Sequence, residues 1–263
     1  MIASRDIDIS SAYNQSYKEF LTLLTGRGVK KSGRAIVSGS KVVPEVIRQK
    51  PEIISAWIAS AKHGQHPLDL PDNIARYRLS SQLFRTLDIN GTGRPLLIVN
   101  VPVMETFNDS VLFSGGALFV PFQDPANVGA VIRSAAAFDI STIVLLEESA
   151  NPFHHKSIRA AGTSLFNTRL LKGPSINNIE DFRWPLIALD AGGVSLHEFV
   201  FPEKFILLPG LEGSGLPKDA EPDHVLSIPM NEGVESLNAA VAVSIALYEW
   251  QCQRNGSDIS CIT

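Results

Sequence analysis

Residues 228–242 read IPMNEGVESLNAAVA, and this stretch decides the fold that we expect for the C-terminal half. A proline-broken strand end leads into a polar segment, and an apolar helix is predicted over residues 237–250. That helix carries small and apolar residues on every side, so we expect it to be buried all round. Polar groups at the mouth of a buried helix are suited to ligand binding. An ordinary N-cap formed by Ser236 or Asn238 is the alternative interpretation.

A second informative segment is DPANVGAVIRSA, residues 124–135, which follows a predicted buried strand over residues 117–122. Asn127 is placed to cap the helix that starts here. Arg133 lies six residues later among small and apolar residues, where a guanidinium needs a carboxylate, a phosphate or a carbonyl. A snorkelling or ion-paired arginine is the simpler alternative.

The third segment is FILLPGLEGSGL, residues 205–216, in which a hydrophobic strand opens into a glycine-rich loop that contains Glu212. Glycines allow the backbone to approach a ligand closely and to adopt positive φ. The spacing is not the G-x-G-x-x-G fingerprint of a dinucleotide-binding fold. By itself this loop is weak support for a binding site.

Taken together and in this order, the three segments resemble the signature of the SpoU (TrmH-like) family of RNA ribose 2′-O-methyltransferases, within the SPOUT superfamily. The resemblance covers residues 115–252 and departs from the family pattern mildly, at Pro209 and at Ala239 and Ala240. The positions that match the three family motifs are Asn127, Gly129 and Arg133, then Gly210, Glu212, Gly213, Gly215 and Leu216, then residues 228–230 and 235–238.

The resemblance implies a parallel α/β SPOUT domain with a C-terminal trefoil knot, in which S-adenosylmethionine (SAM) binds without a metal. It places Gly210, Ile228, Met230 and Leu237 around the cofactor. It also implies that the methyl group passes to a ribose 2′-hydroxyl of structured RNA, either rRNA or tRNA. A guanidinium is a poor base, so we expect Arg133 to grip the phosphate beside the target ribose and to stabilise the developing alkoxide. The residues expected to complete this catalytic group are Asn127, Glu212, Ser236 and Asn238.

The charge of the chain is divided unevenly between its two halves. The net charge is −4, but residues 1–99 hold 14 Lys and Arg against 8 Asp and Glu, whereas residues 100–263 hold 9 against 19. Such asymmetry is typical of a phosphate-binding module joined to an acidic one. We expect Lys30, Lys31 and Arg34, on a basic loop, to capture RNA backbone. An ordinary solvated surface is the alternative.

Three parts of the chain are predicted. Residues 1–106 form an N-terminal RNA-substrate-binding domain that looks like a small α/β/α fold related to ribosomal proteins. Residues 107–116, rich in Asn, Ser and Gly, form a linker. Residues 117–263 form the SAM-binding methyltransferase domain, whose strands alternate with helices and therefore favour a parallel sheet.

Several other classes of protein fit the sequence less well. No apolar run is long enough to span a bilayer, no signal peptide is apparent, and Cys252 and Cys261 suggest no disulfide framework; we therefore expect a cytoplasmic protein. The family resemblance, with the apolar C-terminal helix, predicts a homodimer. A non-catalytic RNA-binding protein with a methyltransferase-like fold is the alternative to an enzyme. Arg159 is a contact to RNA or to a partner subunit, or equally a surface ion pair, and His154-His155 is interpreted as a loop pair.

Overall fold

The computed structural model describes residues 6–63, 66–67, 69–108, 110–111, 113–179, 182–213, 215–217 and 220–255. Residues 1–5, part of the N-terminal stretch in which no signal peptide is apparent, and Cys261 lie outside these ranges. The chain divides into two compact units: unit 1 is Met1–Val103 with Asn151–Phe166, and unit 2 is Met104–Ala150 with Asn167–Thr263. The chain therefore enters unit 1 twice, because the segment that follows the second strand of unit 2 belongs to unit 1.

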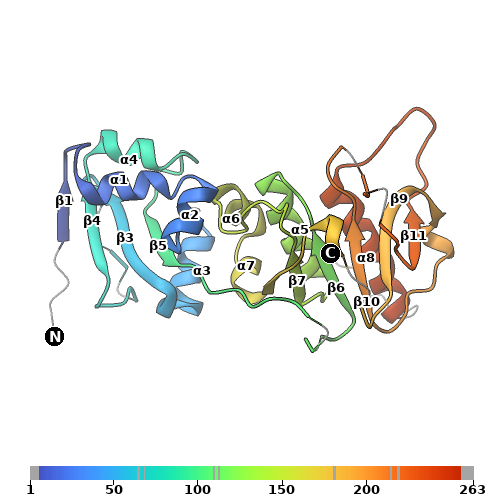
Figure 1. Cartoon of the computed structure of the whole chain (residues 1–263). Helices are drawn as coiled ribbons and strands as arrows, with labels where there is room; N and C mark the ends of the chain where they lie inside the picture. The colour runs from blue at the N-terminus through green and yellow to red at the C-terminus, as the bar shows by residue number, and fades with distance from the viewer. Residues whose placement is uncertain are drawn as a thin grey trace. The chain divides into compact units, whose positions relative to one another are not determined.

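Unit 1 is built on a five-stranded mixed sheet in the order β1-β4-β3-β5-β2 (Figure 1). Leu83 and Phe84 of α4 and Phe20 of α1 pack with the strand residues on one face of this sheet. Unit 1 is thus an α/β unit that also includes Asn151–Phe166, which the sequence assigned to the methyltransferase domain; the RNA-binding domain over residues 1–106 stays a prediction. Its elements are β1 (Asp6–Ile9), α1 (Gln15–Thr22), α2 (Gly26–Ser32), β2 (Arg34–Val37), α3 (Val42–Gln49), a 3₁₀ helix (Pro51–Ile53), β3 (Ile54–Ser60), β4 (Ala75–Leu79), α4 (Ser81–Leu87), β5 (Leu96–Asn100) and α6 (His155–Ala161).

The second unit contains a six-stranded sheet in the order β11-β9-β10-β6-β7-β8, in which every strand pair is parallel. Figure 1 shows most of these strands side by side in green to orange. The parallel sheet expected from the alternation of strands and helices is confirmed. Its elements are β6 (Gly116–Val120), α5 (Pro125–Ala137), β7 (Thr142–Leu145), β8 (Arg169–Lys172), β9 (Leu186–Ser195), β10 (Phe205–Pro209), β11 (His224–Ser227) and α8 (Ala239–Asn255), with 3₁₀ helices at Ile176–Asn178 and Leu196–Glu198, while α7 (Ser164–Asn167) spans the boundary of the units.

Residues 107–116 differ from the linker that their composition predicts. Phe107, Val111 and Phe113 are buried in the apolar cluster that covers one face of the second sheet. Gly116 already belongs to β6. The described part of this segment is thus a packed portion of unit 2, because its aromatic residues outweigh the polar ones around them. The C-terminal trefoil knot stays a prediction.

The long C-terminal helix α8 is not buried all round, so that prediction is wrong. Its residues Ala240, Val243 and Leu247 pack inward, and α5 is its main helical neighbour. Val241, Ile245 and Tyr248, which recur at helical spacing, are 46%, 37% and 50% exposed. We call these three residues the α8 apolar face. An exposed apolar stripe of this kind usually marks an association surface.

Candidate active site

A cavity of about 550 Å³ opens at the carboxyl ends of the strands of the second sheet. The chain leaves β6, β9, β10 and β11 at this edge, and each exit supplies part of the lining. Asp124 follows β6, Asp190 lies on β9 just beyond its buried residues, Gly210 follows β10, and Ile228 follows β11. Ligand sites in open parallel sheets occur at this end of the strands, where loops diverge from a fixed edge.

The loop after β10 has a conformation that depends on its glycines. Leu211 and Gly215 close it by exchanging two backbone hydrogen bonds, of 2.8 and 3.0 Å. A Cβ atom on Gly210 would lie 2.7 Å from the carbonyl carbon of Gly215, too close for any other residue. The glycine pattern therefore has a structural cause, and it brings Glu212 to the cavity wall.

Three polar side chains from distant parts of the chain form a hydrogen-bonded series at the cavity. Asn127 donates from Nδ2 to Glu212 Oε1 at 2.5 Å, and Asn238 donates from Nδ2 to Asn127 Oδ1 at 3.0 Å. The second carboxylate oxygen of Glu212 accepts from the backbone N–H of Asp124 at 3.1 Å. We call Asn238, Asn127 and Glu212 the polar relay. All three residues also line the cavity.

The helix caps around this site differ in part from the sequence interpretation. Asp124, not Asn127, is the N-cap of α5, since its carboxylate accepts from the Ala126 N–H at 2.9 Å. Asn127 is thereby free to bond across to the other two motifs. Asn238 caps α8 and also bonds to another motif. Its Oδ1 accepts from the N–H groups of Ala240 and Val241, while its Nδ2 donates to Asn127.

Eight of the nine catalytic and cofactor-binding residues expected from the sequence line this one cavity. These are Asn127, Gly210, Glu212, Ile228, Met230, Ser236, Leu237 and Asn238. The sequence interpretation missed Asp190, which follows a buried apolar run on β9 and belongs to no recognisable motif. Its position on β9, where the run of buried residues ends, is the only signal that could have revealed it.

Arg133 does not line the cavity. It is exposed on α5, and no other described residue forms a hydrogen bond or an ion pair with its side chain. Residues six apart on an α-helix point about 120° from each other, so Asn127 and Arg133 cannot face the same space. The Ser134 hydroxyl, next in the chain, accepts a hydrogen bond of 2.7 Å from the Ser244 hydroxyl of α8. Ser134 thus faces α8, whereas Arg133 points about 100° away from it, toward solvent.

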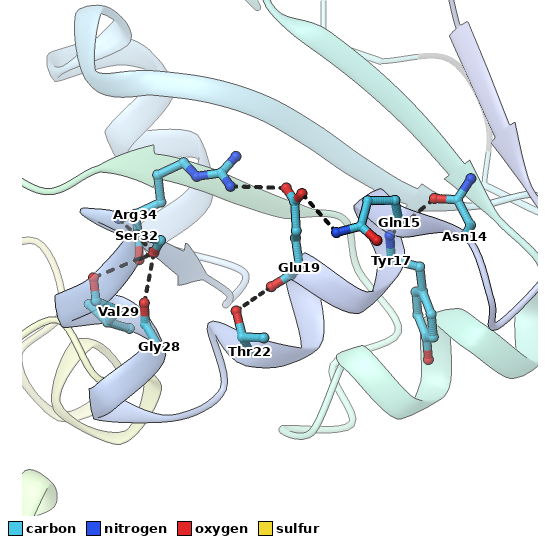
Figure 2. Close-up of polar contacts among 9 residues, drawn as sticks. All are labelled: Asn14, Gln15, Tyr17, Glu19, Thr22, Gly28, Val29, Ser32 and Arg34. Carbon is cyan, nitrogen blue, oxygen red and sulfur yellow. Dashed lines mark hydrogen bonds and ion pairs between the residues drawn. The ribbon is translucent and has the colours of Figure 1, made fainter.

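The basic residues of unit 1 lie on a helix and a strand rather than on a loop. Lys30 and Lys31 occupy the last turn of α2, and Arg34 opens β2. Arg34 donates to Glu19 at 3.3 Å, and Glu19 in turn accepts from Gln15 (Figure 2). Both lysines are exposed. Cations in the last turn of a helix stabilise it, so these lysines have a structural role whether or not they bind RNA, which stays a prediction.

The histidine pair belongs to α6 rather than to a loop. His154 is the N-cap of this helix, and its ring centroid is 4.2 Å from that of His155. Burial lowers the pKa of His155 to about 4, with help from the positive charges of His154 and Lys156. Arg159, on the same helix, donates to Asn90 Oδ1 at 3.2 Å. No carboxylate in the described part of the chain forms an ion pair with it.

Residues 117–248 match the family profile described as the SpoU rRNA Methylase family. The chain belongs to this family. A relative from Syntrophobacter fumaroxidans, named ribosomal RNA small subunit methyltransferase G 2, is 46% identical over 95% of this chain. The chain spans only about half of that protein, 49%, so the name does not assign a reaction to the matched half.

Two further proteins extend the comparison of this SpoU family member. The 23S rRNA (guanosine(2553)-2′-O)-methyltransferase RlmP of Bacillus subtilis is 28% identical over 91% of this chain and 97% of its own length. The crystal structure of the SpoU methyltransferase AviRb from Streptomyces viridochromogenes, in complex with AdoMet, superposes with a TM-score of 0.79 at 23% identity. It covers 92% of this chain and 98% of AviRb, which shows that the two share the SPOUT fold. Among the described helices of this chain, none is long and apolar enough to cross a membrane.

Proposed function

We propose that this protein transfers a methyl group from SAM to a ribose 2′-hydroxyl of structured RNA, either rRNA or tRNA. The observation that carries the proposal is the polar relay, which joins residues of all three motifs at the rim of one cavity. The similar proteins support it, since RlmP is named as a 2′-O-methyltransferase and AviRb was solved with AdoMet.

The cavity fits a cofactor of this kind. Its apolar lining includes Leu189, Ile228 and Leu237, which suit an adenine ring. Its charged lining residues are all acidic, namely Asp124, Asp190, Glu212 and Glu235, and no Lys, Arg or His is among the described residues that line it. An anionic wall favours a ligand that carries a positive sulfonium and an ammonium group. A volume of about 550 Å³ lies within the usual range for small-molecule sites.

The chemistry is an in-line displacement, in which the bond between the methyl carbon and sulfur breaks as the bond to the ribose oxygen forms. SAM supplies an already activated methyl group, so the protein has to position the hydroxyl and ease the loss of its proton. The Glu212 carboxylate is held by Asn127 and by the backbone of Asp124, and it therefore keeps the first turn of α5 against the cavity. Ser236 is exposed on the cavity rim and is free to contact the acceptor nucleotide.

Arg133 has the role of holding the phosphate next to the target ribose and stabilising the alkoxide as it forms. Because it points away from the cavity of its own chain, we infer that it serves the cavity of a second copy. The α8 apolar face, on the helix that Ser134 contacts, provides a surface on which two copies would pair. The proposed protein is thus a homodimer, and each active site is complete only when two chains meet.

Unit 1 supplies the affinity for RNA. Lys30 and Lys31 are exposed, and Arg34 keeps guanidinium N–H groups beyond the one that contacts Glu19. Cations that replace condensed counterions on a phosphate backbone give binding that weakens as salt rises. We place the reaction in the cytoplasm, where rRNA and tRNA of bacteria occur.

A labelling experiment tests this function directly. The purified protein is incubated with SAM carrying a tritiated methyl group and with rRNA or tRNA that lacks modifications. We expect label in RNA that survives alkaline hydrolysis as a dinucleotide, because a 2′-O-methyl group removes the nucleophile that cleaves the chain. Label recovered only in mononucleotides means base methylation and contradicts the ribose assignment. Binding of SAM and RNA without transfer favours the non-catalytic RNA-binding alternative.

A further inference from the structure

Unit 1 contains a cavity of its own, of about 210 Å³, on the side of the sheet that α3 covers. It is bounded by the β2–α3 connection, by the start of α3, by β3 and by the loop that precedes β5. Nothing in the proposed methyl transfer uses it. Its volume is below the range of about 300–1,000 Å³ that drug-sized ligands occupy, so it suits one small planar group rather than a whole cofactor.

The floor of this cavity is apolar and aromatic. Trp57 of β3 is only 6% exposed yet contributes to the lining, and Val43 and Ile47 of α3 lie beside it. Along β3 the neighbours Ala56 and Ile58 belong to the core on the opposite face, so Trp57 faces α3 by simple strand alternation. A large aromatic residue that lines an open cavity, rather than filling it, leaves an apolar surface for a ligand.

The rim, in contrast, carries polar and charged side chains that are not bonded to other described residues. Arg94, His63 and Asp69 line the cavity and are exposed. Throughout the described ranges, no side-chain hydrogen bond or ion pair is formed by any of these three residues. The rim therefore offers a donor pair and a carboxylate acceptor next to an apolar floor.

The loop that carries Arg94 is held in place from below. Asp88 is buried, and its carboxylate accepts from the Gly93 N–H at 2.7 Å and from the Thr92 hydroxyl at 3.0 Å. Asn90 donates to the Ser38 hydroxyl at 2.7 Å, which ties this loop to the end of β2. The two loops that bound the cavity are thus linked before any ligand arrives, and less ordering entropy has to be lost on binding.

We propose that this cavity holds one unstacked base of the RNA substrate, and that it makes unit 1 selective for a single-stranded or bulged position. The proposal rests on the proposed function in that RNA is the ligand, but it concerns unit 1 alone. Proteins that read RNA sequence take up splayed-out bases against aromatic or guanidinium groups and bond their edges. Arg94 and His63 can donate to base carbonyl and ring nitrogen atoms, and Asp69 can accept from an amino group.

The test compares RNA with and without bases. Short single-stranded RNA oligomers, one for each base, are titrated against the full chain, together with an abasic ribose-phosphate oligomer of equal length. Binding is followed by the anisotropy of an end label and by tryptophan fluorescence, with Trp57→Phe identifying the responding residue. We expect at least one base to bind about tenfold more tightly than the abasic chain, because a stacked base contributes about 1–3 kcal/mol, and to change the Trp57 signal.

Two variants and a matched control complete the experiment. Arg94→Ala removes the rim guanidinium and Ser40→Leu places an apolar side chain at the exposed mouth; both should reduce the tenfold advantage to less than about threefold. Arg85→Ala removes an equally exposed arginine of α4 that does not line the cavity, and it should keep the advantage. Native-state hydrogen exchange of the β3 amides should be unchanged in all three, which shows that unit 1 folds, and calorimetric SAM binding should be unchanged because the cofactor cavity lies in unit 2.

The result that overturns the proposal is equal affinity for base-containing and abasic oligomers, including no measurable binding of either, or an advantage that survives in Arg94→Ala and Ser40→Leu. This failure is distinct from failure of the proposed function. If labelled methyl still reaches a ribose hydroxyl, only the base pocket is disproved. If base selection is observed without methyl transfer, the pocket stands and the enzymatic assignment falls.

Discussion

Asn238 donates a hydrogen bond of 3.0 Å to Asn127, although the two residues lie 111 positions apart in the chain. The bond joins the start of α8 to the first turn of α5. Asn127 in turn donates a hydrogen bond to Glu212 in the loop after β10. Each amide in this series acts as both donor and acceptor, which a carboxylate or an aliphatic side chain could not do. The polar relay therefore depends on the chemical identity of its residues as much as on their positions.

The first prediction concerns Asn127→Asp. The change removes the donor to Glu212 and places a second carboxylate against the first, so we expect the free energy of unfolding of unit 2 to fall by about 1–3 kcal/mol at neutral pH. SAM affinity should fall as well, because the cavity wall is displaced. Urea unfolding and calorimetry measure the two effects. Asn178→Asp, at an exposed position of the same unit, is the control, and an equal loss in both variants would contradict the role of the relay.

The second prediction tests the apolar wall of the cavity. Leu237→Arg places a charged group against an apolar surface, and we expect it to abolish measurable SAM binding in calorimetry. Val234→Arg introduces the same charge three residues earlier, where the side chain is 51% exposed and does not line the cavity. This control should bind SAM almost as the parent does. Similar losses in the two variants would mean that charge alone, and not the pocket, determines the effect.

The sequence predicted most of the cavity because its motifs coincide with the exits of parallel strands. Gly210 directly follows β10, and Glu212 lies two residues after Gly210. Ile228 directly follows β11. Once the strands are parallel, their carboxyl ends meet at one edge and these residues must gather there. Asp190 could not be found in the same way, since the apolar run before it resembles any other buried strand.

Two other features could not be read from the sequence, for different reasons. Lys30 and Lys31 follow two glycines, which suggested a loop, yet α2 is a helix that starts at the N-cap Thr25. Gly28 is required there because a Cβ atom would lie 1.9 Å from the Thr22 carbonyl oxygen. The exposed face of α8 was missed because a helix that lacks a polar side gives no periodic signal that separates solvent from core.

The third prediction concerns pH. His155 has its pKa lowered from 6.5 to about 4 by burial and by neighbouring positive charge, and its Nδ1 is buried without a hydrogen-bond partner among the described residues. The unfolded chain therefore binds a proton between these values that the folded chain does not, so the free energy of unfolding of unit 1 decreases as pH falls from 6.5 to 4. His155→Gln should flatten this part of the profile.

Native-state hydrogen exchange of β3 amides follows unit 1 separately from unit 2. The matched variant is His197→Gln in unit 2, where the side chain is 89% exposed. It should leave the slope for unit 1 unchanged. If the profile for His155→Gln is parallel to that of the parent, then the pKa of His155 is the same in the folded and unfolded chains, and the prediction is wrong.

The fourth prediction concerns assembly. Ile245→Glu places a charge in the centre of the α8 apolar face, and we expect it to convert the proposed dimer to a monomer in sedimentation velocity at micromolar concentration. Methyl transfer should be lost with it, because each cavity would lack the Arg133 of the second copy. Val200→Glu changes an 82% exposed valine elsewhere in unit 2 and should remain a dimer. A parent protein that sediments only as an active monomer would disprove the shared site.

The last prediction separates chemistry from binding at Arg133. Arg133→Ala should reduce methyl transfer by on the order of 10²-fold or more if the guanidinium stabilises the developing alkoxide. SAM binding in calorimetry should stay near the parent value, because Arg133 does not line the cavity of its own chain. Arg133→Lys keeps the charge but loses the planar pair of donors, so we expect nearly the same damage. Arg183→Ala, at another exposed arginine of unit 2, controls for the loss of one positive charge.

Mixing experiments then locate the site at which Arg133 acts. Arg133→Ala and Leu237→Arg chains are each inactive alone, the first for lack of the guanidinium and the second for lack of the cofactor. In a mixed dimer, the intact cavity of the Arg133→Ala chain faces the intact Arg133 of the other, so about one site in each such dimer should recover activity. Recovery on mixing supports action across the interface. If Arg133→Ala retains full activity, or if mixed dimers stay inactive, Arg133 does not act on the second copy.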